Sequence, residues 1–208
     1  TSECKYGYID KAGETVIPFV YDDAFPFSHG VAIVGKGECQ TSPCQYGLIN
    51  HWQETVAPIQ YLELNPFFNQ RALAANRGEG YGYLNPEGEE VIAMQYKDAT
   101  RFQEGKAAVR PDSLYGYINT KGEWLIRPAY EDADLFSGGL APVALPDSSW
   151  GYIDTTGKMV IPAKYDYAFP FQNDTAKVYK DEPSPDNPEF TITNTYWINR
   201  EGKVVEEK

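Results

Sequence analysis

The chain has 208 residues and a formal net charge of −12, and 42% of its residues are hydrophobic and 14% aromatic. This content predicts a folded protein rather than a disordered acidic tail. The negative charge argues against nucleic acid and anionic lipid surfaces as partners, because both are negatively charged themselves. The apolar stretches are far shorter than a membrane span, so we expect no membrane insertion.

A short motif, Tyr-Gly-Tyr-Ile-Asp at residues 6–10, recurs about every 35 to 40 residues. The later copies begin at Tyr46, Tyr81, Tyr115 and Trp150, and a weaker copy begins at Tyr196. A period of this length is typical of a repeat array, in which each unit buries its apolar face against its neighbours. We therefore interpret the chain as one array, with units near residues 1–30, 31–71, 72–105, 106–139, 140–174 and 175–208.

Each unit is predicted to be a meander of three short strands. In one copy, the strands are expected at residues 140–144, 150–153 and 159–161, with turn residues between them. Asp or Asn opens the second turn and Gly closes it, because Gly accepts the positive φ that the turn needs. Gln53 stands where the other copies have this Gly. We expect that hairpin to be the most strained or the most rearranged.

A connector with recurring Tyr and Phe residues joins the units, and in the first copy these are Tyr21 and Phe27. We expect these rings to wedge between adjacent units. The Gly of the repeated motif is expected to let an aromatic ring or a neighbouring backbone lie close against it. No segment of helical length shows a helical period. The fold class is therefore all-β. An open β-solenoid or superhelix is preferred, because the first unit lacks its first strand, and a five-bladed propeller-like ring is the alternative.

The motif, followed by Val-Ile-x-Pro and a connector of the form Tyr-Asp-x-Ala-x-x-Phe, resembles the WG repeat found in many bacterial proteins. The resemblance covers essentially the whole chain, although the copies at Tyr46 and Tyr196 depart from the pattern. Only the copy at Trp150 has the Trp-Gly pair itself. Such repeats are described as interaction or binding modules. The resemblance therefore implies binding, and it supplies no catalytic residue and no cofactor.

Cys39 and Cys44 lie in a widened loop of the second unit. Their spacing differs from that of a C-x-x-C pair, so we predict a disulfide, with a metal or redox pair as the alternative. A disulfide implies an oxidising compartment: the periplasm, the cell surface or the medium. Cys4 aligns with Cys44. We therefore expect the partner of Cys4 upstream of residue 1, and the chain to be a fragment of a longer protein.

Carboxylates recur after the connector Tyr, among them Asp23, Asp132 and Asp166. One interpretation is that they cap backbone N–H groups where the chain turns. The other is an acidic row that meets Ca²⁺ or a cationic partner. Paired carboxylates also serve glycoside hydrolases. An active site usually breaks a repeat, however, whereas these residues follow it.

Three tryptophans, Trp52, Trp124 and Trp197, vary between copies. They are interpreted either as packing between units or as platforms for a sugar or a protein. We expect a non-catalytic module that presents an acidic, aromatic surface to a protein partner, in a bacterial envelope or secreted protein. A carbohydrate or cell-wall binding module is the alternative, and a hydrolase is less favoured. No cofactor and no metal site is expected.

Overall fold

The computed structural model describes residues 4–37, 44–184 and 190–207. The chain divides into two compact parts, residues 1–101 and 102–208. All regular structure in the described residues is β-strand, which confirms the expected all-β class. Within these described ranges, no helix is long and apolar enough to cross a membrane.

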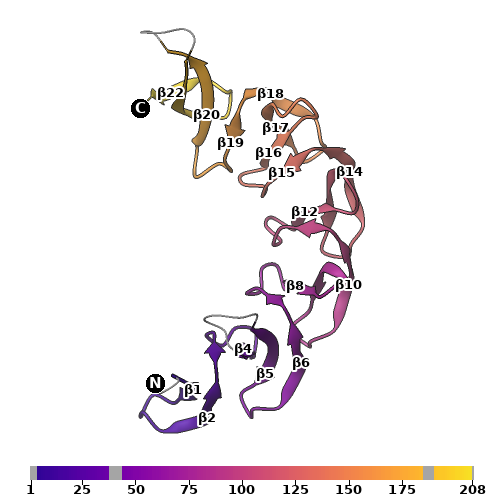
Figure 1. Cartoon of the computed structure of the whole chain (residues 1–208), viewed down its shortest axis with the longest axis vertical. Helices are drawn as coiled ribbons and strands as arrows, with labels where there is room; N and C mark the ends of the chain where they lie inside the picture. Colours follow the sequence, from indigo (N-terminus) through magenta and orange to yellow (C-terminus); the bar gives the residue numbers. More distant parts are fainter. Residues whose placement is uncertain (1–3, 38–43, 185–189, 208) are drawn as a thin grey trace. The chain divides into compact units, whose positions relative to one another are not determined.

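The first part contains a hairpin and two antiparallel sheets (Figure 1). Its strands are β1 (Tyr6–Ile9), β2 (Thr15–Tyr21), β3 (Asp23–Ala24), β4 (Val31–Lys36), β5 (Gln45–Asn50), β6 (Thr55–Tyr61), β7 (Glu63–Leu64), β8 (Ala72–Asn76), β9 (Gly80–Leu84), β10 (Glu90–Tyr96) and β11 (Asp98–Ala99). Strands β1 and β2 pair with each other, β3 to β6 pair in sequence order, and so do β7 to β10.

The second part repeats the same plan. Its strands are β12 (Lys106–Arg110), β13 (Tyr115–Asn119), β14 (Trp124–Tyr130), β15 (Asp132–Ala133), β16 (Leu140–Ala144), β17 (Trp150–Asp154), β18 (Met159–Tyr165), β19 (Tyr167–Ala168), β20 (Ala176–Pro183), β21 (Thr191–Ile198) and β22 (Val204–Glu207). Strands β12 to β14 pair in sequence order, and β15 to β18 and β19 to β22 each form a four-stranded sheet.

Each four-stranded sheet contains a short strand that the sequence interpretation did not include. It comes directly after the connector Tyr and has two residues, as in β15, where Asp132 pairs with Ala144 and Ala133 pairs with Val143 of β16. The repeated antiparallel sheets confirm the expected β-repeat array. The choice between an open solenoid and a closed ring stays a prediction.

The Gly of the repeated motif lies against a bulge in the next strand. Trp150 pairs with Tyr165 and Tyr152 pairs with Ile161, so β18 has two extra residues between these pairs. A Cβ added at Gly151 would stand 2.6 Å from the carbonyl oxygen of Ile161. This contact confirms that a neighbouring backbone approaches the Gly. The same close contact occurs at Gly7, Gly47, Gly82 and Gly116.

The turn after the motif is held by its first residue. In the copy that begins at Trp150, the Asp154 carboxylate accepts hydrogen bonds from the backbone N–H groups of Thr156 at 2.8 Å and Lys158 at 3.1 Å. Gly157 closes this turn with a φ of +85°. Gln53 closes the equivalent turn with a φ of 63°, and its N–H donates to the carbonyl oxygen of residue 50 at 3.1 Å. That hairpin is therefore strained at Gln53 but keeps the common turn.

The aromatic residues pack between successive sheets, as expected. The Tyr152 hydroxyl donates to the carbonyl oxygen of Phe169 at 2.9 Å, and its ring centroid lies 5.0 Å from that of Phe171. The Tyr130 hydroxyl donates to the carbonyl oxygen of Gly157, in the turn of the next sheet, at 3.2 Å. These hydrogen bonds satisfy the phenol groups inside an apolar core. The bond to the carbonyl oxygen 17 residues later also occurs at Tyr8, Tyr83 and Tyr117.

Candidate functional site

The repeated residues have structural roles, so the candidates for function are the residues that depart from the repeat. Three such departures fall in the sheet β19–β22. Tyr167 stands where earlier connectors have a carboxylate, at Asp23, Glu63, Asp98 and Asp132. Lys177 stands where the other sheets have Ile33, Leu73, Ala108 and Pro142. Trp197 stands where they have Leu48, Tyr83, Tyr117 and Tyr152.

Two of these departures, Tyr167 and Lys177, lie together in an aromatic cluster. The ring of Tyr167 lies 4.9 Å from that of Phe169, which lies 5.3 Å from the perpendicular ring of Tyr179. The Lys177 ammonium lies 4.6 Å from the centroid of Phe169 and 4.8 Å from that of Tyr179. Cation–π contacts of this kind hold the lysine over the ring faces.

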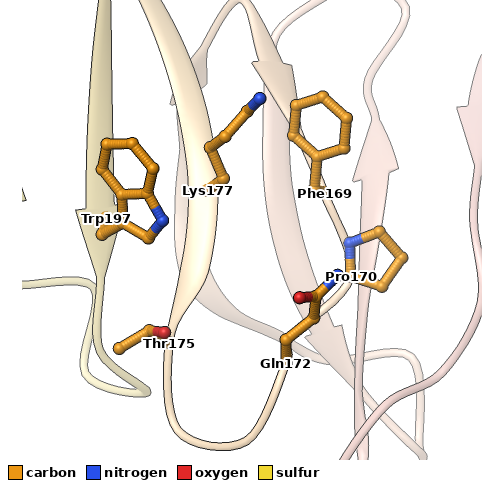
Figure 2. A pocket seen from close by; sticks show the side chains of 6 residues that line it. All are labelled: Phe169, Pro170, Gln172, Thr175, Lys177 and Trp197. Atoms are coloured by element: carbon orange, nitrogen blue, oxygen red, sulfur yellow. The ribbon is translucent and has the colours of Figure 1, made fainter. Parts of the chain in front are cut away.

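A cavity of about 320 Å³ adjoins this cluster, and we call it the Lys177 cavity. Its lining residues are Phe169, Pro170, Gln172, Thr175, Lys177 and Trp197. Figure 2 shows the Lys177 side chain between the rings of Trp197 and Phe169. Lys177 and Trp197 are paired across β20 and β21, so their side chains share one face of the sheet. The Phe169 N–H donates to the Lys177 carbonyl oxygen at 3.0 Å, which fixes the connector beside β20.

The charge of the cavity comes from Lys177. Within the described residues, its ammonium contacts the two aromatic rings and forms no ion pair. Lys180, three residues further along β20, differs because it pairs with Glu182. Burial raises the pKa of Tyr167, and the negative charges of Asp134 and Asp132 raise it further. The phenol therefore stays neutral at physiological pH, and the cavity is bordered by one cation among apolar and neutral polar groups.

The three predicted carboxylates bond to backbone N–H groups where the chain turns. Asp23 and Asp132 each accept a hydrogen bond from the N–H of the next residue, at 2.9 and 2.8 Å. Asp166 accepts one from the N–H of Asp181 at 2.7 Å. Asp166 also lies one position before the equivalent of Asp132, which is Tyr167. These contacts match the capping interpretation, and binding of a cationic partner stays a prediction.

The predicted tryptophans lie on different elements. Trp52 is 79% exposed at the turn between β5 and β6, and Trp124 begins β14. Trp197 alone of the three lines the Lys177 cavity. Sequence reasoning missed Tyr167, Phe169, Lys177 and Tyr179. The signal that finds two of them, Tyr167 and Lys177, is the loss of a recurring residue type at an aligned position.

Cys39 lies outside the described residues, so its disulfide with Cys44 stays a prediction. Cys44 is buried, and Cys4 has an exposed free thiol. In the part of the chain that the structure describes, no group of three or more His, Cys, Asp or Glu side chains is arranged to hold a metal ion.

Comparisons with known proteins identify a family. The WG containing repeat matches residues 6–38, 81–114, 115–145 and 150–182, which together are more than half of the chain. No curated protein sequence matches the chain.

Solved structures that match the chain include BamB from Moraxella catarrhalis, with 13% identity over 86% of this chain and 58% of that chain and a TM-score of 0.47. Another is a eukaryotic initiation factor, with 9% identity over 95% of this chain and 57% of that chain and a TM-score of 0.52. A third is the WD40 β-propeller domain of Doa1, with 9% identity over 86% and 64% and a TM-score of 0.36. The chain spans less than two thirds of each of these structures. At 9% identity, the match to the initiation factor concerns the fold alone.

Proposed function

The chain belongs to the WG containing repeat family, and on that premise we propose that it is a non-catalytic scaffold that binds a protein partner. The family and the repeated sheets indicate a repeat-based scaffold or binding module. The observation that carries the finer proposal is that Lys177 and Trp197, which depart from the repeat, line one cavity, and that Tyr167, a third departure, packs against its wall residue Phe169. Residues that the repeat does not require for folding are available for recognition.

The chemistry of this surface supports a protein partner. Tyr and Trp are among the residues that contribute most to the binding energy of protein interfaces. Tyr167 is 38% exposed, and Lys177 and Trp197 are half-buried, so a partner reaches large side chains that are already held in place. Such preorganisation lowers the entropy cost of binding.

The net charge of −12 adds a requirement for the partner. A chain this acidic attracts a basic partner, accelerates its association and repels acidic ones. Because the attraction acts between exposed charges, the association rate falls as salt is added.

The proposal places the protein outside the cytoplasm, in a bacterial envelope or secreted protein. It rests on Cys39 and Cys44, whose spacing suits a disulfide that staples one loop. A polysaccharide is the second candidate ligand. The Trp197 ring beside the Gln172 amide and the Thr175 hydroxyl favours it, because sugars stack on aromatic rings and hydrogen-bond to such groups.

Affinity capture tests the proposal. The immobilised chain is exposed in parallel to cell-envelope protein and to purified cell-wall and surface polysaccharides. We expect retention of a protein that is lost in Trp197→Ala and kept in Trp52→Ala, which removes the 79% exposed ring of another sheet. Loss in Trp52→Ala alone would place the binding surface elsewhere, and retention of polysaccharide alone would favour the second candidate.

A further inference from the structure

The Lys177 cavity contains a charge where the repeat has an apolar side chain. The equivalent cavity of the first part shows what the repeat builds without this change. It has a volume of about 260 Å³ and is lined by Phe25, Pro26, Phe27, Ser28, Val31, Ile33, Pro66 and Phe67. Ile33 there takes the place of Lys177, and Phe25 takes the place of Phe169. The apolar walls are therefore common to both cavities, and the cation belongs to one of them.

Two features fit Lys177 to bind an anion. Its ammonium is held over Phe169 and Tyr179 at 4.6 and 4.8 Å and, among the described residues, has no carboxylate partner. The neighbouring rings also exclude water from one side of the ammonium. A charge-assisted hydrogen bond is stronger in such a partly dehydrated place than in bulk water.

The side chains that line the cavity determine which chemical group can accompany the anion of the ligand. Phe169, Pro170 and Trp197 present apolar surface beside the ammonium, while Gln172 and Thr175 supply neutral hydrogen-bonding groups. A ligand that uses both features has one carboxylate next to an apolar group. The volume of about 320 Å³ is at the lower end of small-ligand pockets, so it suits one or two residues of a peptide.

We propose that the Lys177 cavity binds the C-terminal carboxylate of a peptide whose last residue is apolar. The carboxylate bonds to the Lys177 ammonium, and the last side chain lies against Phe169 and Trp197. The terminal carboxylate and the last side chain are attached to the same Cα, so one residue can contact both the Lys177 ammonium and the aromatic rings. This inference rests on the proposed function, because it identifies the segment of the protein partner that the scaffold holds.

The charge of the whole chain favours a chain end over an acidic segment. At a net charge of −12, a run of Asp and Glu residues is repelled as it approaches. A C-terminus contributes a single negative charge, and the rest of the partner can be basic. Lys177 then attracts the C-terminal carboxylate, and the acidic remainder of the chain attracts the basic part of the same partner.

The test is an NMR titration of the whole chain with ¹⁵N-labelled tryptophan side chains, in which the Trp197 signal is assigned from Trp197→Phe. The probes are N-acetyl-leucine, its uncharged amide N-acetyl-leucinamide, and glucuronate. We expect N-acetyl-leucine to shift the Trp197 signal saturably and to leave the Trp52 signal in place. The amide is expected to bind at least about tenfold more weakly, which corresponds to the loss of one charge-assisted hydrogen bond.

Matched variants separate the cation from general charge. Lys177→Met keeps the aliphatic stem and removes the charge, and it is expected to weaken N-acetyl-leucine binding about tenfold. Lys203→Gln removes an exposed charge from the turn between β21 and β22 and is expected to leave binding unchanged. Thermal unfolding of both variants checks that the fold is intact.

Three outcomes would overturn the inference. They are equal binding of the acid and the amide, a shift with glucuronate alone, and no shift at millimolar probe concentrations. Capture of a protein partner that depends on Trp197 but not on Lys177 would leave the proposed function standing without this inference. Binding of N-acetyl-leucine without any retained protein would support the carboxylate site and contradict the scaffold function.

Discussion

The missing Cβ of the motif Gly sets how closely the third and fourth strands of each four-stranded sheet approach. At Gly116, an added Cβ would stand 2.5 Å from the carbonyl oxygen of Ile126 and 2.7 Å from the backbone nitrogen of Pro128. Both atoms belong to the backbone of the bulged strand, so no side-chain rotation relieves the contact. The bulged strand can therefore pack this closely only against a residue that has no Cβ.

Gly116→Ala is expected to lower the free energy of unfolding by about 2 to 3 kcal/mol, because the strand pair must separate to admit the methyl group. Urea denaturation measures the change. Gly105→Asn is the control. At Gly105, φ is +72° and an added Cβ would meet no atom within 4 Å, and Asn tolerates this conformation, so a loss below about 1 kcal/mol is expected. Equal losses in the two variants would contradict the steric explanation.

Gln53→Gly is expected to raise the free energy of unfolding by up to about 1 kcal/mol, because Gly adopts the φ of 63° without strain. The reverse change, Gly13→Gln, places the same side chain at a φ of +87° with open space around it and is expected to destabilise by a similar amount. Chemical denaturation compares both with the parent chain. A destabilised Gln53→Gly would mean that the contact from Gln53 Nε2 to the Tyr21 hydroxyl, at 3.4 Å, outweighs the strain.

The sequence predicts these residue-scale roles only in part. The loss of Gly at Gln53 is visible in a single chain, and so is the need for close approach at Gly116. The bulge is not visible, because it depends on which residues pair between strands. Lys177 was missed for the same reason, since its place opposite Trp197 follows from the register of β20 and β21.

At the scale of the elements, the connector turns of the second part are tied to one another by side chains outside the repeat. The Glu104 carboxylate accepts hydrogen bonds from the N–H groups of Gly138 at 2.6 Å and Gly139 at 3.0 Å. The Arg200 guanidinium donates to the carbonyl oxygens of Gly138 at 2.7 Å and Asn173 at 3.1 Å. These bonds join the turns of three successive sheets. No recurring sequence motif predicts them.

Glu104→Ala is expected to speed amide hydrogen exchange at Gly138 and Gly139, because both N–H groups lose their acceptor. The free energy of unfolding is expected to fall by about 1 kcal/mol or less, since the carboxylate is exposed. Glu87→Ala, an exposed carboxylate in another turn, is expected to change neither quantity. Unchanged exchange at Gly138 in Glu104→Ala would show that the turn does not depend on this bond.

At the scale of the whole molecule, buried tyrosines set an alkaline limit to stability. Burial, followed by the charges of Tyr21 and Asp23, raises the pKa of Tyr8 to about 12. Burial also raises the pKa values of Tyr83, Tyr117 and Tyr152 far above their usual value near 10. The folded state thus keeps protons that the unfolded state releases. Their contribution to stability is fully present below about pH 10 and is lost as pH rises through the folded pKa values.

The free energy of unfolding is expected to be insensitive to these groups near pH 8 and to fall steeply between about pH 10 and 12. Denaturant titrations at several pH values measure the slope. Tyr152→Phe removes one such phenol, so its slope above about pH 10 is expected to be shallower than that of the parent chain. An identical slope would show that Tyr152 does not retain its proton in the folded state.

The period of the repeat was enough to predict an all-β array with turns at Asp or Asn and Gly. It did not predict the short strands such as β15, whose two residues have no pattern of their own. Binding residues are hidden for a related reason. Tyr167 and Lys177 are ordinary residues in isolation, and they become candidates only when each is compared with its counterparts in the other sheets.

The measurement that tests the central claim most directly compares Trp197→Ala with Tyr152→Phe for both thermal stability and retention of the captured protein partner. The two positions are equivalent in the repeat. We predict that Trp197→Ala loses retention and keeps its unfolding temperature within a few degrees, and that Tyr152→Phe retains the partner and loses about 1 kcal/mol with its hydrogen bond. Full retention by Trp197→Ala would contradict the claim that departures from the repeat carry the binding.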